Sequence, residues 1–309
     1  MIMNHKCFLP LLLSCAVLLG VAGLGISKSG DAKIRVLIID GQNNHDWKGT
    51  TPFLKEQLEK SGKFTVSVAT TPPRGGNAQA WEAFKPDFAA CDVVLSNYNG
   101  PQWQPAAVRE SFEKFLTEGG GLVNVHAANN AHNGWKEFEK ATGLLWRGNK
   151  DGARVYLDEV GKVLRMEIGK GPGAGHGPQH EYVVKIREAD HPITKGMPVD
   201  WLHTRDELYH GQRGPGEDMR ILATAFSAKE KRGTGVHEPM LWWIPVGKGK
   251  AVTNVLGHVS KGKAQTDPAM KCVGFLTLVA RSCEWVATGK VTIPVPDNFP
   301  TVDKTSQVD

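Results

Sequence analysis

Short apolar runs separated by polar turns dominate the chain between residues 34 and 125. Four such runs are expected to be buried strands: residues 34–39, 64–69, 92–96 and 122–125. They are rich in β-branched residues and are bounded by Gly, Pro and polar residues, which is typical of buried strands. Between them, apolar residues recur at helical spacing and predict helices over residues 52–60, 105–116 and 133–142. This alternation predicts an α/β fold with a doubly wound, mostly parallel sheet.

The pattern changes beyond residue 150, where strands are expected without matching helices. These later strands are predicted at residues 154–157, 182–186, 220–225, 240–244 and 251–256. One late helix is expected at 268–287. Because the second half lacks helices of its own, we interpret residues 28–290 as one α/β domain whose sheet is extended by later strands and loops; two domains divided near Lys150 is the alternative. The Pro-rich tail, residues 291–309, is expected to lie on the surface or to be disordered.

The N-terminus has the pattern of a secretory signal peptide. Lys6 precedes a long apolar run from Phe8 to Gly25, and small residues close that run. Residues 1–27 are therefore predicted to be a cleaved signal peptide, which predicts an exported protein, periplasmic or secreted, without membrane contact after cleavage. An uncleaved membrane anchor is the alternative, because the run approaches the length that spans a bilayer.

Composition and charge exclude several classes of function. The chain has 309 residues, 40% of them hydrophobic, with a formal net charge of +5. Basic and acidic residues are interleaved without a basic block, so nucleic-acid binding is not expected. The sequence has no dinucleotide fingerprint, no P-loop and no G-x-S-x-G elbow. The cysteines after the signal, Cys91, Cys272 and Cys283, are expected to be buried apolar residues. The oligomeric state stays open.

Two predicted strands lead into histidines after a Gly-rich turn. Residues 119–126 read GGGLVNVH, and residues 249–258 read GKAVTNVLGH. In an open parallel sheet, ligands bind outside the carboxyl ends of the strands. His126 and His258 are therefore expected to face a shared ligand site.

Further polar residues are expected at the same edge of the sheet. His45 and Asp46 follow the first strand, and Asp206, Glu207 and Tyr209 form a dense polar segment. A carboxylate in an enclosed site can have a raised pKa and act as a general acid or base. We expect this role for Glu207, within a catalytic set of His126, Glu207 and His258.

Histidine and tryptophan spacing raises two further possibilities. His176 and His180 have H-x3-H spacing, but the Gly and Pro residues around them exclude a regular helix, so they are weak metal candidates. A divalent metal such as zinc, held by a wider set with His126 or His258 and Glu207, stays open. Trp47 and Trp201 lie near predicted loops, where aromatic faces can stack on sugar rings.

These features together resemble the ThuA-like (trehalose-utilisation) family, within the class I glutamine amidotransferase-like fold. The resemblance lies in segments 34–46, 119–126, 191–196, 206–209 and 247–258, with His176 upstream of the third. It implies a flavodoxin-like three-layer sandwich and a role in disaccharide or keto-sugar metabolism. In amidotransferases of this fold a cysteine nucleophile follows a central strand; His126 stands there in this chain, so glutaminase activity is not expected.

The leading functional hypothesis is an exported enzyme that acts on a disaccharide or keto-sugar by His/Glu acid–base chemistry. His45, Asp46, Trp47, His176, Asp206 and Tyr209 are expected to bind the small-molecule carbohydrate. Histidines with one carboxylate suit proton abstraction next to a carbonyl, isomerisation or elimination. A non-catalytic carbohydrate-binding or scaffold protein and a metal-dependent hydrolase are the alternatives.

Overall fold

Five parallel strands form the centre of the sheet. They are β1 (Ile34–Asp40), β2 (Phe64–Thr70), β3 (Val93–Ser96), β4 (Gly121–Val125) and β13 (Gly249–Asn254), in the order β2-β1-β3-β4-β13. This is the strand order of flavodoxin-like sheets. The computed structural model describes residues 1–2 and 32–309, so the predicted signal peptide lies almost entirely outside the described residues. The two strands that lead into His126 and His258 are neighbours, because β13 pairs with β4.

The later strands extend this sheet in antiparallel fashion. From β13 the order continues through β12 (His237–Val246), β11 (Arg220–Phe226), β8 (His180–Ile186) and β9 (Asp200–Asp206). The predicted extension is thus confirmed.

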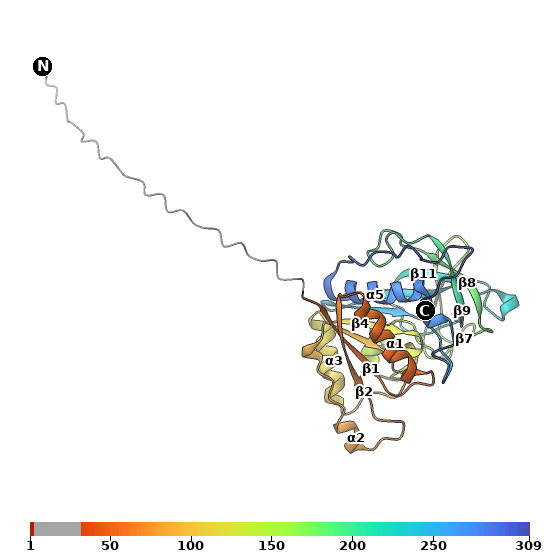
Figure 1. Cartoon of the computed structure of the whole chain (residues 1–309), viewed down its shortest axis with the longest axis horizontal. Helices are drawn as coiled ribbons and strands as arrows, with labels where there is room; N and C mark the ends of the chain where they lie inside the picture. Colours follow the sequence, from red (N-terminus) through yellow and green to blue (C-terminus); the bar gives the residue numbers. More distant parts are fainter. Residues whose placement is uncertain (3–31) are drawn as a thin grey trace. The chain divides into compact units, whose positions relative to one another are not determined.

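Two pairs of short strands complete the fold. β5 (Arg154–Leu157) and β6 (Val163–Met166) attach to β12, and β7 (Gly175–His176) pairs with β10 (Tyr209–His210). In Figure 1, β7, β8 and β9 lie together on one side of the molecule.

Helices cover both faces of the sheet. On one face, α1 (Trp47–Lys60) and α5 (Val273–Thr288) lie beside each other (Figure 1). On the other face, α3 (Ala106–Glu118) and α4 (Lys136–Thr142) pack on the sheet, and the short α2 (Ala78–Glu82) lies near its β2 edge. This is the expected three-layer sandwich.

Alternating residues of β1 show why both faces are covered. Val36 and Ile38 pack in the cluster that contains α1 and α5, whereas Leu37 and Ile39 pack in the cluster that contains α3 and α4. Because successive side chains of a strand point to opposite faces, an uninterrupted apolar run needs a helical layer on each side.

Helix boundaries differ from the predicted ones where side chains serve tertiary contacts. The first helix is predicted to begin at residue 52, but α1 begins at Trp47 and includes Thr50 and Thr51. Both hydroxyls accept hydrogen bonds from the Asn97 side chain, at 2.9 and 3.0 Å. The late helix begins at Val273 instead of residue 268, after a short 3-10 turn.

Residues Lys33–Asp309 form one compact unit that includes the C-terminal tail. The Ser306 carbonyl accepts a hydrogen bond from Val273 N (3.0 Å), and the Val308 N–H donates to Lys271 O (2.9 Å). Phe299 packs edge-on against Trp201 with ring centroids 5.5 Å apart. The tail therefore lies bound on the surface. None of the helices within the described part is long and apolar enough to cross a membrane.

Candidate functional site

Three histidines meet beyond the carboxyl ends of three parallel strands. His45 follows β1, His126 follows β4 and His258 follows β13. Each offers a ring nitrogen, and these nitrogens lie within 4.8 Å of one another. The ring centroid of His45 lies 4.7 Å from that of His126 and 4.9 Å from that of His258. We call this set the histidine centre.

Hydrogen bonds fix the ring of His126. Its Nδ1–H donates to the Val255 carbonyl at 3.0 Å, which leaves the Nε2 lone pair free. The Tyr209 hydroxyl lies 3.0 Å from that Nε2 and can donate to it, so this hydrogen bond must give way before Nε2 binds a metal. A second-shell carbonyl bond of this kind sets the tautomer and the orientation of metal-binding histidines. The Nε2 atom is thus presented to the centre.

The backbone at His126 is strained. Its φ angle is +47°, in the left-handed region that non-Gly residues rarely adopt. Such strain persists where the surrounding structure holds it, and it is concentrated at active sites. This sharp turn after β4 aims the imidazole out of the sheet and into the centre.

The Glu207 carboxylate faces the histidine centre. Its oxygens lie 3.2 Å from His258 Nε2, 3.4 Å from His176 Nε2 and 3.9 Å from His126 Nε2. The side chain is 11% exposed. Burial, followed by the negative charges of Asp206 and Asp267, raises the pKa of Glu207 to about 7. The carboxyl group can therefore exchange a proton near neutral pH.

The three imidazoles are kept neutral. Burial, together with the nearby His258 ring, lowers the pKa of His45 to about 4. Burial also lowers the pKa of His126 well below its ordinary value, and lowers that of His258. Neutral imidazoles that share one small space are suited to binding a cation.

Asp206 lies behind the site instead of in it. The residue is fully buried, and its carboxylate accepts hydrogen bonds from the backbone N–H groups of Glu207, Gly257 and His258 and from the His203 ring. No lone pair is directed to a ligand space. The expected substrate-binding role of Asp206 is therefore corrected to one of positioning the segments that carry Glu207 and His258.

Asp46 and Trp201 also depart from their expected roles. Asp46 Oδ2 accepts a hydrogen bond from Ala264 N at 3.1 Å, so it holds a neighbouring loop. Trp201 is fully buried, because its position in β9 turns the indole into the core. Trp47 is half-buried, with the Lys48 ammonium 5.7 Å from its ring.

The proposed metal pair of His176 and His180 is not brought together as a metal group. His176 faces Glu207, whereas the His180 ring bonds to the Pro178 carbonyl and packs near Tyr182. Within residues 32–309, the group of residues with metal-ligand spacing is the histidine centre instead.

Sequence reasoning missed two side chains that support the site. The Gln179 amide lies 3.0 Å from His258 Nδ1, and the His203 ring lies 2.7 Å from Asp206 Oδ2. Gln179 stands between the two histidines of the H-x3-H segment, and nothing in the local sequence distinguishes its amide as a partner of His258. His203 lies within a predicted loop and carried no local signal.

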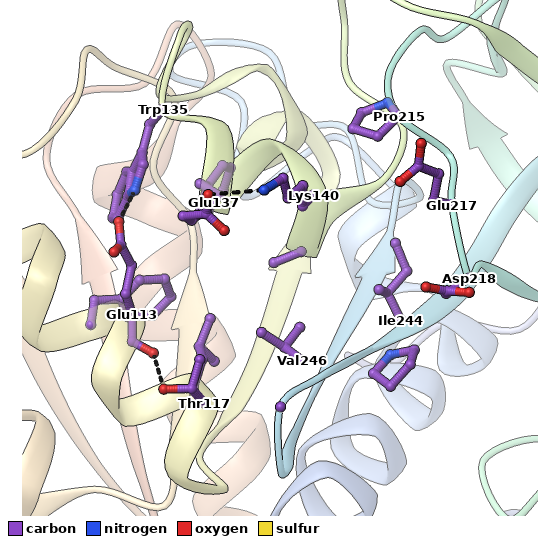
Figure 2. A pocket seen from close by; sticks show the side chains of 16 residues that line it. Glu113, Thr117, Trp135, Glu137, Lys140, Pro215, Glu217, Asp218, Ile244 and Val246 are labelled. Carbon is purple, nitrogen blue, oxygen red and sulfur yellow. Dashed lines mark hydrogen bonds and ion pairs between the residues drawn. The ribbon is translucent and has the colours of Figure 1, made fainter.

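A separate cavity of about 440 Å³ lies between α3 and α4 (Figure 2). Two of its four carboxylates have partners: Glu113 accepts from the Trp135 indole N–H at 2.6 Å, and Glu137 pairs with Lys140 at 3.0 Å, while Glu217 and Asp218 also line the cavity. Its lining includes no residue of the histidine centre. This cavity therefore offers no comparable group of reactive side chains.

Comparisons with known proteins agree with this fold. A crystal structure of a ThuA-like protein from Parabacteroides merdae ATCC 43184 shares 40% identity, with a TM-score of 0.84, over 90% of this chain and 98% of the other. A ThuA-like protein from Bacteroides uniformis ATCC 8492 shares 18% identity, with a TM-score of 0.55, over 86% of this chain and 98% of the other. No curated protein sequence matches the chain.

The family comparison covers most of the described unit. Residues 35–286 match the ThuA family model, whose description is trehalose utilisation. The matched range includes every residue of the histidine centre and Glu207. The chain therefore belongs to the ThuA family, as its sequence motifs indicated.

Proposed function

We propose that the protein is a metal-assisted enzyme that acts on a carbohydrate, a disaccharide or an oxidised sugar, with Glu207 as its proton-transfer group. The observation that carries this proposal is the convergence of three neutral imidazoles and one protonatable carboxylate. These groups come from loops far apart in the sequence, from His45 to His258. Such convergence of polar groups with perturbed pKa values is characteristic of active sites.

The donor set fits a divalent metal such as zinc. Three imidazole nitrogens are a common protein ligand set for catalytic zinc, which keeps a further position open. His45, His126 and His258 would hold the metal, and Val255 O would fix the His126 ring. When bound, the metal would act as a Lewis acid on a substrate oxygen.

This assignment changes the roles of two histidines. We expected His126 and His258 to transfer protons, but lowered pKa values disfavour their charged forms near neutral pH. We therefore assign both rings as ligands. Glu207 is left as the group that takes a proton from the substrate or returns it, and His176 and Tyr209 border the same space.

The family description supports the proposed substrate class, and the residue that follows β4 bears on glutaminase activity. The family description points to sugar metabolism. The resemblance implies that amidotransferases of this fold carry a cysteine nucleophile where His126 stands in this chain, and Cys91, Cys272 and Cys283 are all buried. We therefore propose sugar-directed chemistry without glutaminase activity.

The test combines metal content with turnover. The purified protein is stripped with a chelator, reloaded with zinc and assayed on native and 3-keto disaccharides by product analysis. We expect H45A, H126A and H258A to lose zinc and turnover together. We expect E207Q to keep zinc and lose turnover by at least about 100-fold, the usual contribution of a general acid or base.

H180Q serves as the control, because His180 lies outside the centre. It should keep both zinc and turnover. Full activity of the stripped protein would overturn the metal role, and full activity of E207Q would overturn the proton-transfer role. Sugar binding without turnover by any zinc-loaded form would favour the binding-protein alternative.

We also propose export, on the basis of Lys6 and the apolar run that follows it. N-terminal sequencing of the protein recovered from its native cells tests this. A mature N-terminus near residues 22–27 supports cleavage, whereas an intact Met1 in the cytoplasmic fraction contradicts export.

A further inference from the structure

A second hollow, lined by side-chain amides, is formed by loops that follow the parallel strands. It has a volume of about 770 Å³, within the range of ligand sites. Its wall comes from the loops after β1, β2 and β3 and from the turn after β4, so it lies at the same strand ends as the centre. The amides in the wall are Gln42, Asn99, Gln102, Gln104, Asn130 and Asn133. We call it the amide-lined hollow.

The chemistry of this wall suits an uncharged, hydroxyl-rich ligand. Each amide carries both donors and an acceptor, and a sugar hydroxyl also donates and accepts. Among the described residues that line the hollow, Arg74 is the only charged one. Trp81 adds an aromatic ring to the wall, as sugar sites often require an apolar surface beside polar groups.

Several of these amides keep unused hydrogen-bonding capacity. In the part of the chain that the structure describes, the side chains of Gln104 and Asn133 make no hydrogen bond, although Asn133 O accepts one from Gln102. Gln42 is 6% exposed, its Nε2 donates to Pro72 O, and its Oε1 has no partner. A buried acceptor without a partner is costly, so the fold holds Gln42 in the wall at an energetic cost.

Hydrogen bonds connect the hollow to the histidine centre. The Asn99 side chain, in the wall, donates to Asn44 Oδ1, and Asn44 Nδ2 lies 3.3 Å from His45 Nε2. On the other side, His126 and Asn130 occupy the two ends of one short 3-10 helix. The hollow and the histidine centre are thus built from shared loops at the same edge of the sheet.

We infer that the amide-lined hollow binds the non-reacting sugar unit of a disaccharide while the other unit lies at the histidine centre. This inference rests on the proposed function. Binding energy from the remote unit would then position the reacting unit. The hollow would distinguish disaccharides from monosaccharides.

The experiment measures binding of trehalose and of glucose to the zinc-loaded protein by calorimetry. The test variant is Q104A/N133A, because both side chains are exposed and their loss should leave the fold intact. The control is E217A, in the cavity between α3 and α4 (Figure 2). We expect the double variant to weaken trehalose binding at least tenfold and glucose binding less than twofold, with no change in E217A.

The outcomes separate this inference from the proposed function. Equal trehalose affinity in the wild type and in Q104A/N133A overturns the hollow as a subsite, even if E207Q abolishes turnover as proposed. Weakened trehalose binding without turnover by the wild type supports the subsite and overturns the enzyme. Absence of binding of either sugar to the zinc-loaded wild type overturns the inference.

Discussion

The backbone N–H groups of Glu207 and His258 donate to the same oxygen, Asp206 Oδ1, at 2.7 and 3.1 Å. One buried carboxylate thus joins the segment that carries Glu207 to the segment that carries His258. The result is the 3.2 Å approach of Glu207 Oε1 to His258 Nε2. The site depends on an anion that does not itself face it.

Replacing that anion should damage both stability and metal binding. D206N leaves the His203 imidazolium without its charged partner and places an NH2 donor against N–H donors that both carboxylate oxygens now accept from. We expect the free energy of unfolding to fall by about 3 kcal/mol, as for other broken buried ion pairs, and zinc affinity to fall at least tenfold. Urea unfolding and zinc titration measure the two effects.

The control for this change is D200N on the same strand. Asp200 pairs with Lys185 near the surface, where its side chain is 35% exposed. Its loss should cost less than about 1 kcal/mol and leave zinc affinity unchanged. If D206N proves no more harmful than D200N, the positioning role of Asp206 is wrong.

The strained turn at His126 predicts an unusual order of stability between two variants. H126A and H126G both remove the imidazole, but glycine adopts a φ of +47° without steric cost. We expect H126G to be more stable than H126A by about 1 kcal/mol, although glycine ordinarily costs more conformational entropy. Chemical unfolding of the metal-free variants measures this, and the reverse order would show that the turn is unstrained.

Zinc should stabilise the protein only when all three histidines are present. A ligand that binds the folded state at one hundred times its Kd adds about 2.7 kcal/mol to the free energy of unfolding. We expect a rise in melting temperature for the wild type and E207Q on zinc addition, and none for H45A. Differential scanning calorimetry with and without chelator makes this comparison. An equal rise in H45A would place the bound ion elsewhere.

His203 predicts a pH dependence of stability. Burial disfavours its charged form, but Cys272 and Asp206 outweigh that cost and raise the pKa of His203 to about 10. Since the folded pKa lies above the ordinary value of about 6.5, the contribution is complete below pH 6.5 and is lost as pH rises toward 10. The slope for one proton is at most about 1.4 kcal/mol per pH unit.

The comparison that isolates this contribution uses H203Q against the wild type. Urea unfolding from pH 6 to pH 10 should show a steeper loss for the wild type than for H203Q, with H180Q behaving as the wild type. Parallel curves for the wild type and H203Q would mean that His203 is not charged in the folded protein.

The sequence by itself determined the parallel strands and the places of His126 and His258. Apolar runs and Gly turns are local signals, and strand ends in a parallel sheet share one edge, so both histidines could be placed without coordinates. The same reasoning placed His45 and Glu207 nearby. These features follow from local pattern and from a general rule of topology.

Only the tertiary structure decided what each side chain does at that edge. Asp206 and Glu207 are neighbours in sequence, yet one is enclosed by the N–H groups of residues 257 and 258 and the other faces three imidazoles. Gln179 reaches His258 across 79 positions of the chain. Such roles depend on which buried backbone groups, distant in sequence, require a hydrogen-bond partner. The local sequence pattern does not indicate which groups these are.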